Sequence, residues 1–164
     1  MSALILKIKN GLNIFQIKLL TVILFWIFTF IILASCTCVK QSSYISDNEY
    51  DGTDAIIKGK VVYTKLMDNK THSFTVFTIL ENYTPTVKEK VLKVISPIDE
   101  ESCGVQFEVN QNWLLFAYKN DAMYTTNRCT RSMEFIPQDD YESYADSFIK
   151  TYHKNLVYLK SKQD

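Results

Sequence analysis

The spacing of hydrophobic and polar positions changes twice along the chain. The seventeen residues from Leu19 to Ser35 carry no charge, and beyond residue 54 short runs alternate apolar with polar side chains. Near the C-terminus the apolar positions recur every three or four residues. These three patterns predict an apolar N-terminal segment, a β-rich region and a final helix.

The alternating region predicts five or six short strands. The first covers 55–63, where β-branched and aromatic residues surround Gly59, and a glycine inside a strand indicates a bulge or a bend. Many short strands separated by turns favour a small barrel or a sandwich. The polar stretch 40–54 is predicted to be a loop. The other expected strands are 73–80, 87–96, 106–109, 113–119 and 123–128.

The final apolar stripe predicts a helix within 138–164 that packs against the strands. Asp139 or Asp140 is expected to cap its N-terminus, with Glu142 three residues after Asp139. Lysines in the C-terminal half suit the helix dipole. The stripe consists of Tyr141, Tyr144, Ala145, Phe148, Ile149, Tyr152, Leu156 and Leu159.

The N-terminal segment predicts export. Three lysines and no acid accompany the apolar run, and two small residues close it, which is typical of a secretory signal peptide over 1–35. The alternative is a retained membrane anchor, because the uncharged stretch continues through Val39 and spanning needs about 20 apolar residues. In both cases the remainder is exported, either secreted or anchored at the cell envelope. We therefore expect a domain over 36–137 followed by the helix.

Charge and motifs exclude several classes of function. The exported part holds 15 basic and 18 acidic residues, and the chain has only two arginines, which argues against a nucleic-acid partner. His72 and His153 have no local partner motif, and no hydrolase, metalloprotease, phosphate-binding or dinucleotide motif is found. We expect a protein that is not an enzyme and that has no cofactor or metal of its own.

The end of the apolar run offers two kinds of cleavage. Leu33-Ala34-Ser35-Cys36 resembles the lipobox of bacterial lipoproteins, in which the cysteine becomes the lipidated first residue. Ordinary signal peptidase could also cut after Ser35. Both routes make Cys36 the new N-terminus.

All four cysteines (Cys36, Cys38, Cys103 and Cys129) lie in the exported part. An even number of cysteines in a small exported domain favours two disulfides. A Cys36–Cys38 bond would close a strained ring, so both should join the distant pair. The alternative is zinc bound by four thiolates, but Cys103 and Cys129 lack the close spacing of structural zinc sites and the compartment is oxidising.

The residues around these cysteines resemble the tissue inhibitors of metalloproteinases, and especially the shorter bacterial-type members with a netrin-like module. The similar segments are Cys36-Thr37-Cys38-Val39, the strand 55–62, and the block that runs from Ser102-Cys103-Gly104-Val105 through 113–117 to Cys129. The resemblance covers most of 36–153. It implies an OB-fold barrel with flanking helices and the disulfides Cys36–Cys103 and Cys38–Cys129, which span 67 and 91 positions.

The chain differs from the animal inhibitors in three places. Lys40 stands where they usually carry proline, and their third N-terminal disulfide and C-terminal subdomain are missing from this sequence. These differences concern the tightness of inhibition and leave the expected fold unchanged.

The resemblance implies a partner, a zinc metalloproteinase, and a mechanism. The free amino group and carbonyl oxygen of Cys36 would chelate the protease's zinc, Thr37 would enter the specificity pocket, and Cys38 and Val39 would flank it. The alternative is a lipoprotein whose barrel binds another partner. Lipidation of Cys36 would attach it to the membrane and would prevent its sulfur from pairing with Cys103.

Overall fold

The computed structural model describes residues 18–23, 36–38, 42–68, 70–137, 141–142 and 144–163. The chain divides into two compact units, 1–35 and 36–164. In the first unit residues 18–23 are helical and exposed, and most of the expected signal segment lies outside the described residues. Within the described ranges, no helix has the length and apolar character needed to cross a membrane.

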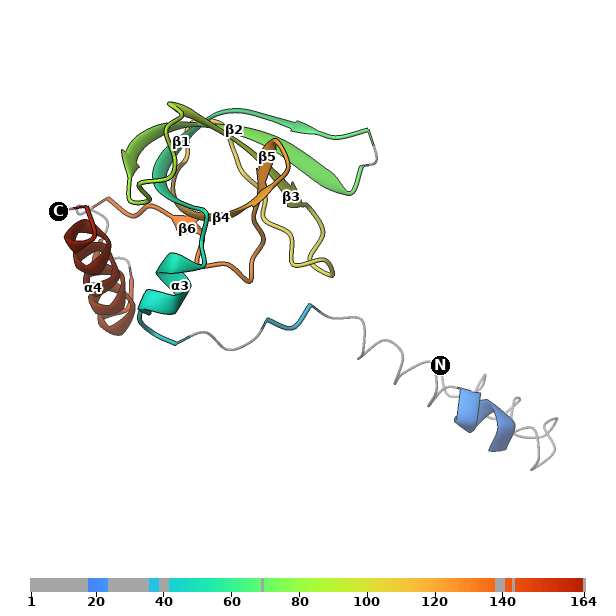
Figure 1. Cartoon of the computed structure of the whole chain (residues 1–164). Helices are drawn as coiled ribbons and strands as arrows, with labels where there is room; N and C mark the ends of the chain where they lie inside the picture. The colour runs from blue at the N-terminus through green and yellow to red at the C-terminus, as the bar shows by residue number, and fades with distance from the viewer. Residues whose placement is uncertain are drawn as a thin grey trace. The chain divides into compact units, whose positions relative to one another are not determined.

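The second unit is mainly β, with a six-stranded mixed sheet and a C-terminal helix (Figure 1). The prediction of five or six strands followed by a helix is thereby confirmed. The strands are β1 (Ala55–Leu66), β2 (His72–Asn82), β3 (Val91–Pro97), β4 (Asn112–Asn120), β5 (Met123–Thr125) and β6 (Met133–Glu134). The helices are α3 (Asp47–Asp51) and α4 (Asp146–Ser161).

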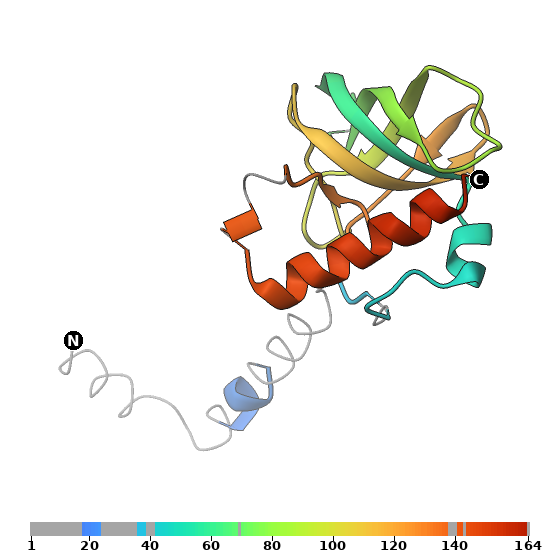
Figure 2. The ribbon, with the colours of Figure 1, turned by 90° about the vertical axis from the view of Figure 1, so that its left-hand side faces the viewer.

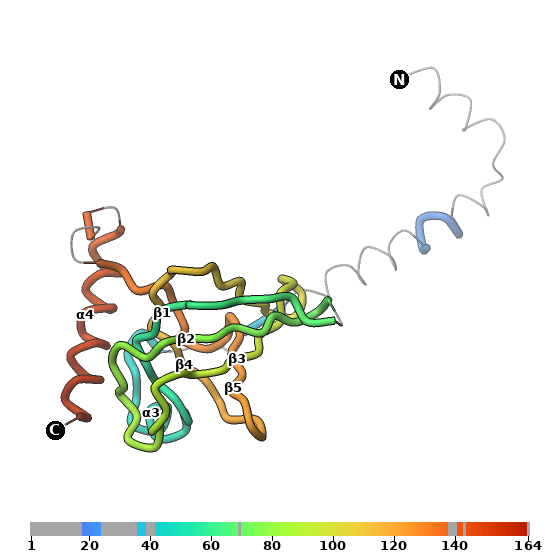
Figure 3. The backbone as a smooth tube through the Cα atoms, turned by 90° about the horizontal axis from the view of Figure 1, so that it is seen from above, coloured from blue at the N-terminus to red at the C-terminus, as the bar shows by residue number. Residues whose placement is uncertain are grey.

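The strands form a closed ring. Their order is β1-β2-β3-β5-β4-β6, and β1 also pairs with β4. All these pairings are antiparallel except the parallel one between β3 and β5. The ring is visible in Figure 1, and Figure 3 shows α4 and the tip of the β1–β2 hairpin at opposite ends of this unit.

The bend in β1 occurs at the expected glycine. The register with β2 shifts between Lys58 and Gly59 and again between Val61 and Tyr63. A Cβ on Gly59 would lie 3.2 Å from the Cβ of Phe77 on β2, so a larger residue would separate the two strands. Beyond the bend, β1 leaves β4 and continues with β2 as a hairpin.

Alternate residues of β1 and β4 supply two separate cores. Ala55 and Ile57 point into the ring, whereas Ile56 between them belongs to the second core. Period-two alternation therefore places apolar residues on both faces of these strands. The inner core consists of Ala55, Ile57, Val61, Phe77, Val87, Leu92, Val94, Val105, Phe107, Leu115 and Ala117.

Helix α4 covers the outer face of β1 and β4 (Figure 2). Its side chains Tyr152, Leu156 and Leu159 are buried there, and Leu159 is fully inaccessible. The other buried members of this second core are Ile45, Tyr50, Ile56, Tyr83, Leu114, Phe116 and Ile136.

Three local predictions are wrong. The stretch 40–54 contains a helix, α3, which Ser46 caps by accepting the Glu49 N–H at 3.2 Å. Residues 106–109 are not a strand, although Phe107 is buried. Helix α4 begins at Asp146, after the N-cap Ala145, whereas the candidate caps Asp139 and Asp140 lie outside the described residues.

The partly exposed carboxylate of Glu81, on β2, links stability to pH. The Tyr83 hydroxyl donates to Glu81 at 2.7 Å, and Lys58 lies 3.4 Å from the same carboxylate. The Tyr83 hydrogen bond, aided by Lys58, holds the pKa of Glu81 below its usual range. Because the folded-state pKa is depressed, the stabilisation is present above the ordinary value of about 4.3 and is lost as pH falls through the folded-state value.

We expect Glu81→Gln to lower the free energy of unfolding at pH 7 by less than about 1 kcal/mol, since the side chain is partly exposed, and to weaken its decline in acid. Urea unfolding between neutral and acid pH measures both effects. Tyr83→Phe serves as the control, because it should raise the pKa of Glu81, followed by NMR, toward its usual value. An identical acid response of wild type and Glu81→Gln would contradict the prediction.

Candidate functional site

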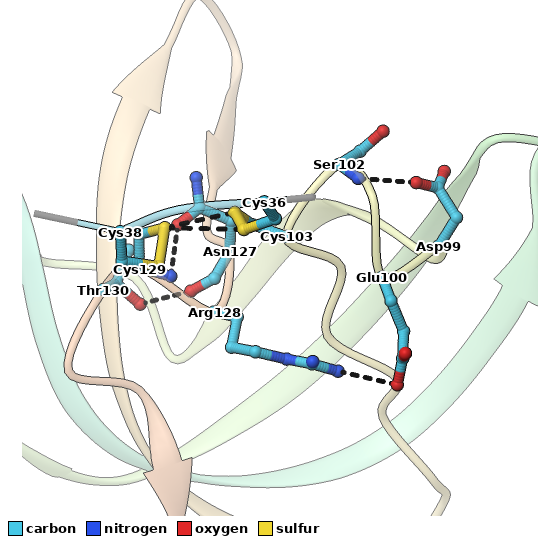
Figure 4. The surroundings of a disulfide bond; sticks show 10 residues. All are labelled: Cys36, Cys38, Asp99, Glu100, Ser102, Cys103, Asn127, Arg128, Cys129 and Thr130. Carbon is cyan, nitrogen blue, oxygen red and sulfur yellow. Dashed lines mark hydrogen bonds and ion pairs between the residues drawn. A yellow bond between two sulfur atoms is a disulfide. The ribbon is translucent and has the colours of Figure 1, made fainter. Parts of the chain in front are cut away.

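The segment 36–38 is held by two disulfides to loops at one end of the ring. Cys36 is bonded to Cys103 in the loop between β3 and β4, and Cys38 is bonded to Cys129, which follows β5 (Figure 4). These are the pairs that the resemblance implies. Thr37 lies between the two bonded cysteines and is exposed.

The four sulfur atoms form one group. All of them lie within 4.8 Å of one another. The Cys129 sulfur is 3.2 Å from that of Cys103 and 4.0 Å from that of Cys36, although it is bonded to neither. The two disulfides are therefore in direct contact.

Hydrogen bonds fix the loop that carries Cys103. Cys103 has a left-handed backbone conformation (φ 57°), and its N–H donates to the carbonyl of Glu100. Asp99 accepts the N–H of Ser102 at 2.6 Å, and the hydrogen bonds from Ser102 hold the pKa of Asp99 below its usual range. The loop is thus closed by its own backbone as well as by the disulfide.

An Asx turn fixes the loop that carries Cys129. The side-chain oxygen of Asn127 accepts the N–H of Cys129 at 2.9 Å, and the Thr130 hydroxyl donates to the Asn127 carbonyl at 2.8 Å. The Arg128 N–H donates to the carbonyl of Cys103 at 2.7 Å, which joins the two cysteine-bearing loops. The Arg128 side chain also reaches Glu100 at 3.8 Å (Figure 4).

The stretch that leads from the site to α3 is clamped by two side chains. Arg131, whose side chain is 10% exposed, pairs with Glu49 and donates to the carbonyls of Ser42 and Tyr44. Asn155 on α4 accepts the N–H of Ile45 at 3.1 Å. The chain is therefore held again a few residues beyond Cys38.

The expected site residues differ in their accessibility. Cys36 is half-buried, whereas Thr37 and Cys38 are exposed; Val39 lies outside the described residues. Sequence reasoning missed Asn127, Arg128 and Arg131, which position the segment. The one local signal was Asn127 two residues before a cysteine, the spacing of an Asx turn.

Gly104 allows the loop of Cys103 to fold back on itself. A Cβ at this position would lie 2.6 Å from the Asp99 carbonyl oxygen and 2.8 Å from the Asp99 nitrogen. Both are backbone atoms, so they cannot rotate away. We expect Gly104→Ala to lower the free energy of unfolding by about 1–3 kcal/mol, the usual range for overpacking, and by more than its control.

Urea unfolding of Gly104→Ala and of the control Gly52→Ala measures this effect. Gly52 has a right-handed helical backbone (φ −83°), and its nearest non-neighbouring atom would be 3.0 Å from an added Cβ. The control should change the free energy of unfolding by less than about 1 kcal/mol. Equal midpoints for the two variants would show that the loop accommodates a side chain at Gly104.

No protein-family model matches the chain, and neither does any of the curated proteins with which it was compared.

Proposed function

We propose that the chain, once cut before Cys36, inhibits zinc metalloproteinases through its new N-terminus. The observation that carries this proposal is the exposed Thr37 between two cysteines that are each bonded to the ring. An N-terminal segment anchored on both sides of one exposed residue suits insertion into an active-site cleft.

The first residue supplies the chemistry. After cleavage, the amino nitrogen and the carbonyl oxygen of Cys36 can bind one metal ion as a five-membered chelate. A catalytic zinc keeps one coordination position open, and its positive charge favours the neutral amine, whose pKa is ordinarily near 8. Thr37 then enters the pocket beside the metal, with Cys38 and Val39 as flanking contacts.

Rigidity makes such an inhibitor effective. Binding normally costs free energy because the segment that binds must become ordered. Here Cys36 and Cys38 are bonded to loops that are themselves joined by the hydrogen bond from Arg128 to Cys103. Most of this ordering therefore occurs when the protein folds, before it meets a protease.

The proposal includes an OB-fold for the ring. Five strands in the order β1-β2-β3-β5-β4, with β1 returning to β4, agree with a small Greek-key barrel of this type. In the netrin-like arrangement the barrel presents the N-terminal segment at one end, and α4 packs on its outer face.

The second candidate is a membrane-anchored lipoprotein whose ring binds another partner. It is favoured by the string Leu33-Ala34-Ser35-Cys36. A thioether on the Cys36 sulfur would be incompatible with the Cys36–Cys103 bond of the structure. The state of Cys36 therefore separates the two candidates.

Two measurements test the proposal. Mass spectrometry of the exported protein should find Cys36 as a free N-terminal residue and two disulfides per chain. The same preparation should inhibit zinc endopeptidases in proportion to its concentration and leave a serine protease, the control, unaffected. A diacylglyceryl group on Cys36, or no inhibition across a panel of zinc endopeptidases, would overturn it.

A further inference from the structure

We propose that the same four cysteines form a tetrathiolate zinc site when both disulfides are reduced. This site differs from the proposed inhibitory one, because the metal is bound by the chain's own sulfur atoms and not held by a protease. The two states exclude each other, since each sulfur either forms a disulfide or binds zinc.

The positions of the sulfur atoms carry the proposal. Tetrahedral zinc binds thiolate sulfur at about 2.3 Å, which places each pair of sulfur atoms roughly 3.8 Å apart. The unbonded pairs Cys103–Cys129 and Cys36–Cys129 are already separated by 3.2 and 4.0 Å, and no pair exceeds 4.8 Å. The two bonded pairs must separate most to reach this geometry.

The fold removes one of the two objections that the sequence raises against zinc, the wide spacing of two of the ligands. Cys103 and Cys129 are far apart in sequence, whereas structural zinc sites usually draw ligands from closely spaced pairs. The hydrogen bond from Arg128 to Cys103 nevertheless brings their loops together. Cys36 and Cys38 form the second, closely spaced pair.

Hydrogen bonds, as well as the disulfides, hold the loops of Cys103 and Cys129 in their conformations. Gly104 donates to Asp99 at 2.7 Å, and the Asn127 side chain accepts from Cys129 at 2.9 Å. These bonds involve no sulfur atom, so two of the four ligands keep their places after reduction.

The disulfides must be reduced before zinc can bind, and a dithiol can reduce them. A dithiol gives each disulfide two electrons and two protons and becomes a disulfide itself, so two dithiols yield four thiols on the chain. Zinc then binds the four thiolates and releases four protons. Reoxidation by a disulfide reverses the sequence and expels the metal.

The test uses the full-length chain in detergent, reduced with a phosphine under anaerobic conditions. In this chain Cys36 is internal, so the result is independent of the proposed inhibitory function. We expect one cobalt ion per chain, with the strong visible and near-ultraviolet bands of a tetrathiolate, and displacement of cobalt by one equivalent of zinc. Zinc should also raise the thermal midpoint of the reduced chain, whereas magnesium should not.

Two variants and the oxidised chain complete the experiment. Cys103→Ser should lose the tetrathiolate spectrum and bind zinc more than about 100-fold more weakly. A residue that only hydrogen-bonds to a ligand would change the zinc affinity by roughly 10–100-fold, so a larger loss identifies Cys103 as a ligand. His153→Gln, the matched control outside the cluster, should behave as wild type. The oxidised chain should bind no cobalt.

Three results would overturn the proposal. These are a reduced chain without tetrathiolate bands, equal zinc affinity for wild type and Cys103→Ser, or zinc bound with no gain in thermal midpoint. The last result would mean that an unfolded chain binds the metal, whereas the proposed site is built by the fold. Should Cys103→Ser fail to fold, Cys38→Ser, in the exposed segment, replaces it with the same expected loss.

Discussion

One additional alanine before Cys36 is expected to reduce inhibition of a zinc metalloproteinase by at least about 100-fold, equivalent to about 2.7 kcal/mol of binding free energy. The extension converts the amine of Cys36 into an amide, which is a poor zinc ligand. The new amine cannot take its place, because the chain would have to shift by one residue, about 3.5 Å, and the disulfide from Cys36 to Cys103 prevents that shift.

The matched control for the extension is Thr37→Val. This variant keeps the amine and the size of the side chain, and it changes only the contact inside the specificity pocket. We expect its inhibition constant to stay within about 10-fold of the wild-type value, since one hydrogen bond contributes roughly 0.5–1.5 kcal/mol. Both proteins should unfold at the wild-type urea concentration. Undiminished inhibition by the extended chain would reject Cys36 as the chelating residue.

Removing the disulfide between Cys38 and Cys129 is expected to have the largest effect on stability. The bond closes a loop with a sequence separation of 91, and loop-entropy arithmetic assigns such a bond about 4–5 kcal/mol. We expect the double variant Cys38→Ser, Cys129→Ser to lose about 4 kcal/mol of unfolding free energy. A chain of this size should then unfold about 10 °C lower.

Calorimetry and urea unfolding under non-reducing conditions measure this loss. The paired control is Cys36→Ser with Cys103→Ser, where the separation is 67 and the expected loss is similar, about 4 kcal/mol. Reduction of the wild-type chain without zinc should destabilise it more than either double variant. A loss below about 1 kcal/mol for Cys38→Ser, Cys129→Ser would show that this bond adds little to the folded state.

The sequence predicts those strands and helices in which apolar and polar residues recur at a regular spacing. Strands β1, β2 and β4 are long and β-branched or aromatic, so their pattern persists in the fold. The stripe of α4 was predicted to extend too far toward the N-terminus because Tyr141 and Tyr144 match the helical spacing. In the structure these two residues precede the helix and place their rings against Tyr152 and Phe148.

The wrong predictions of a strand at 106–109 and of a loop in place of α3 also have physical causes. Phe107 looks like a strand residue because it is buried, but it is held by edge-to-face contacts with Phe77 and Trp113 and not by strand pairing. Helix α3 was missed because it has five residues and only one buried side chain, Tyr50. The stability of a helix this short depends on its cap and on tertiary contacts, and not on a repeated spacing of apolar residues.

The candidate site could be predicted only in part. The apolar run and Cys36 are local features, so the sequence locates the segment that would act. The closeness of the loops of Cys103 and Cys129 depends on the pairing of β1 with β4 and of β3 with β5, which no local pattern specifies. For the same reason, the sequence spacing alone does not show that the four sulfur atoms lie together.

The clamp on the stretch 42–45 determines when the site can be completed during synthesis. A chain emerges from its N-terminus, so Cys38 and the stretch 42–45 appear early, whereas their partners Cys129, Arg131 and Asn155 appear late. The sequence separations of these contacts are 91, 89 and 110 residues. The Cys38 thiol must therefore wait for its partner until residue 129 has emerged, and the Ile45 N–H must wait until residue 155 has emerged.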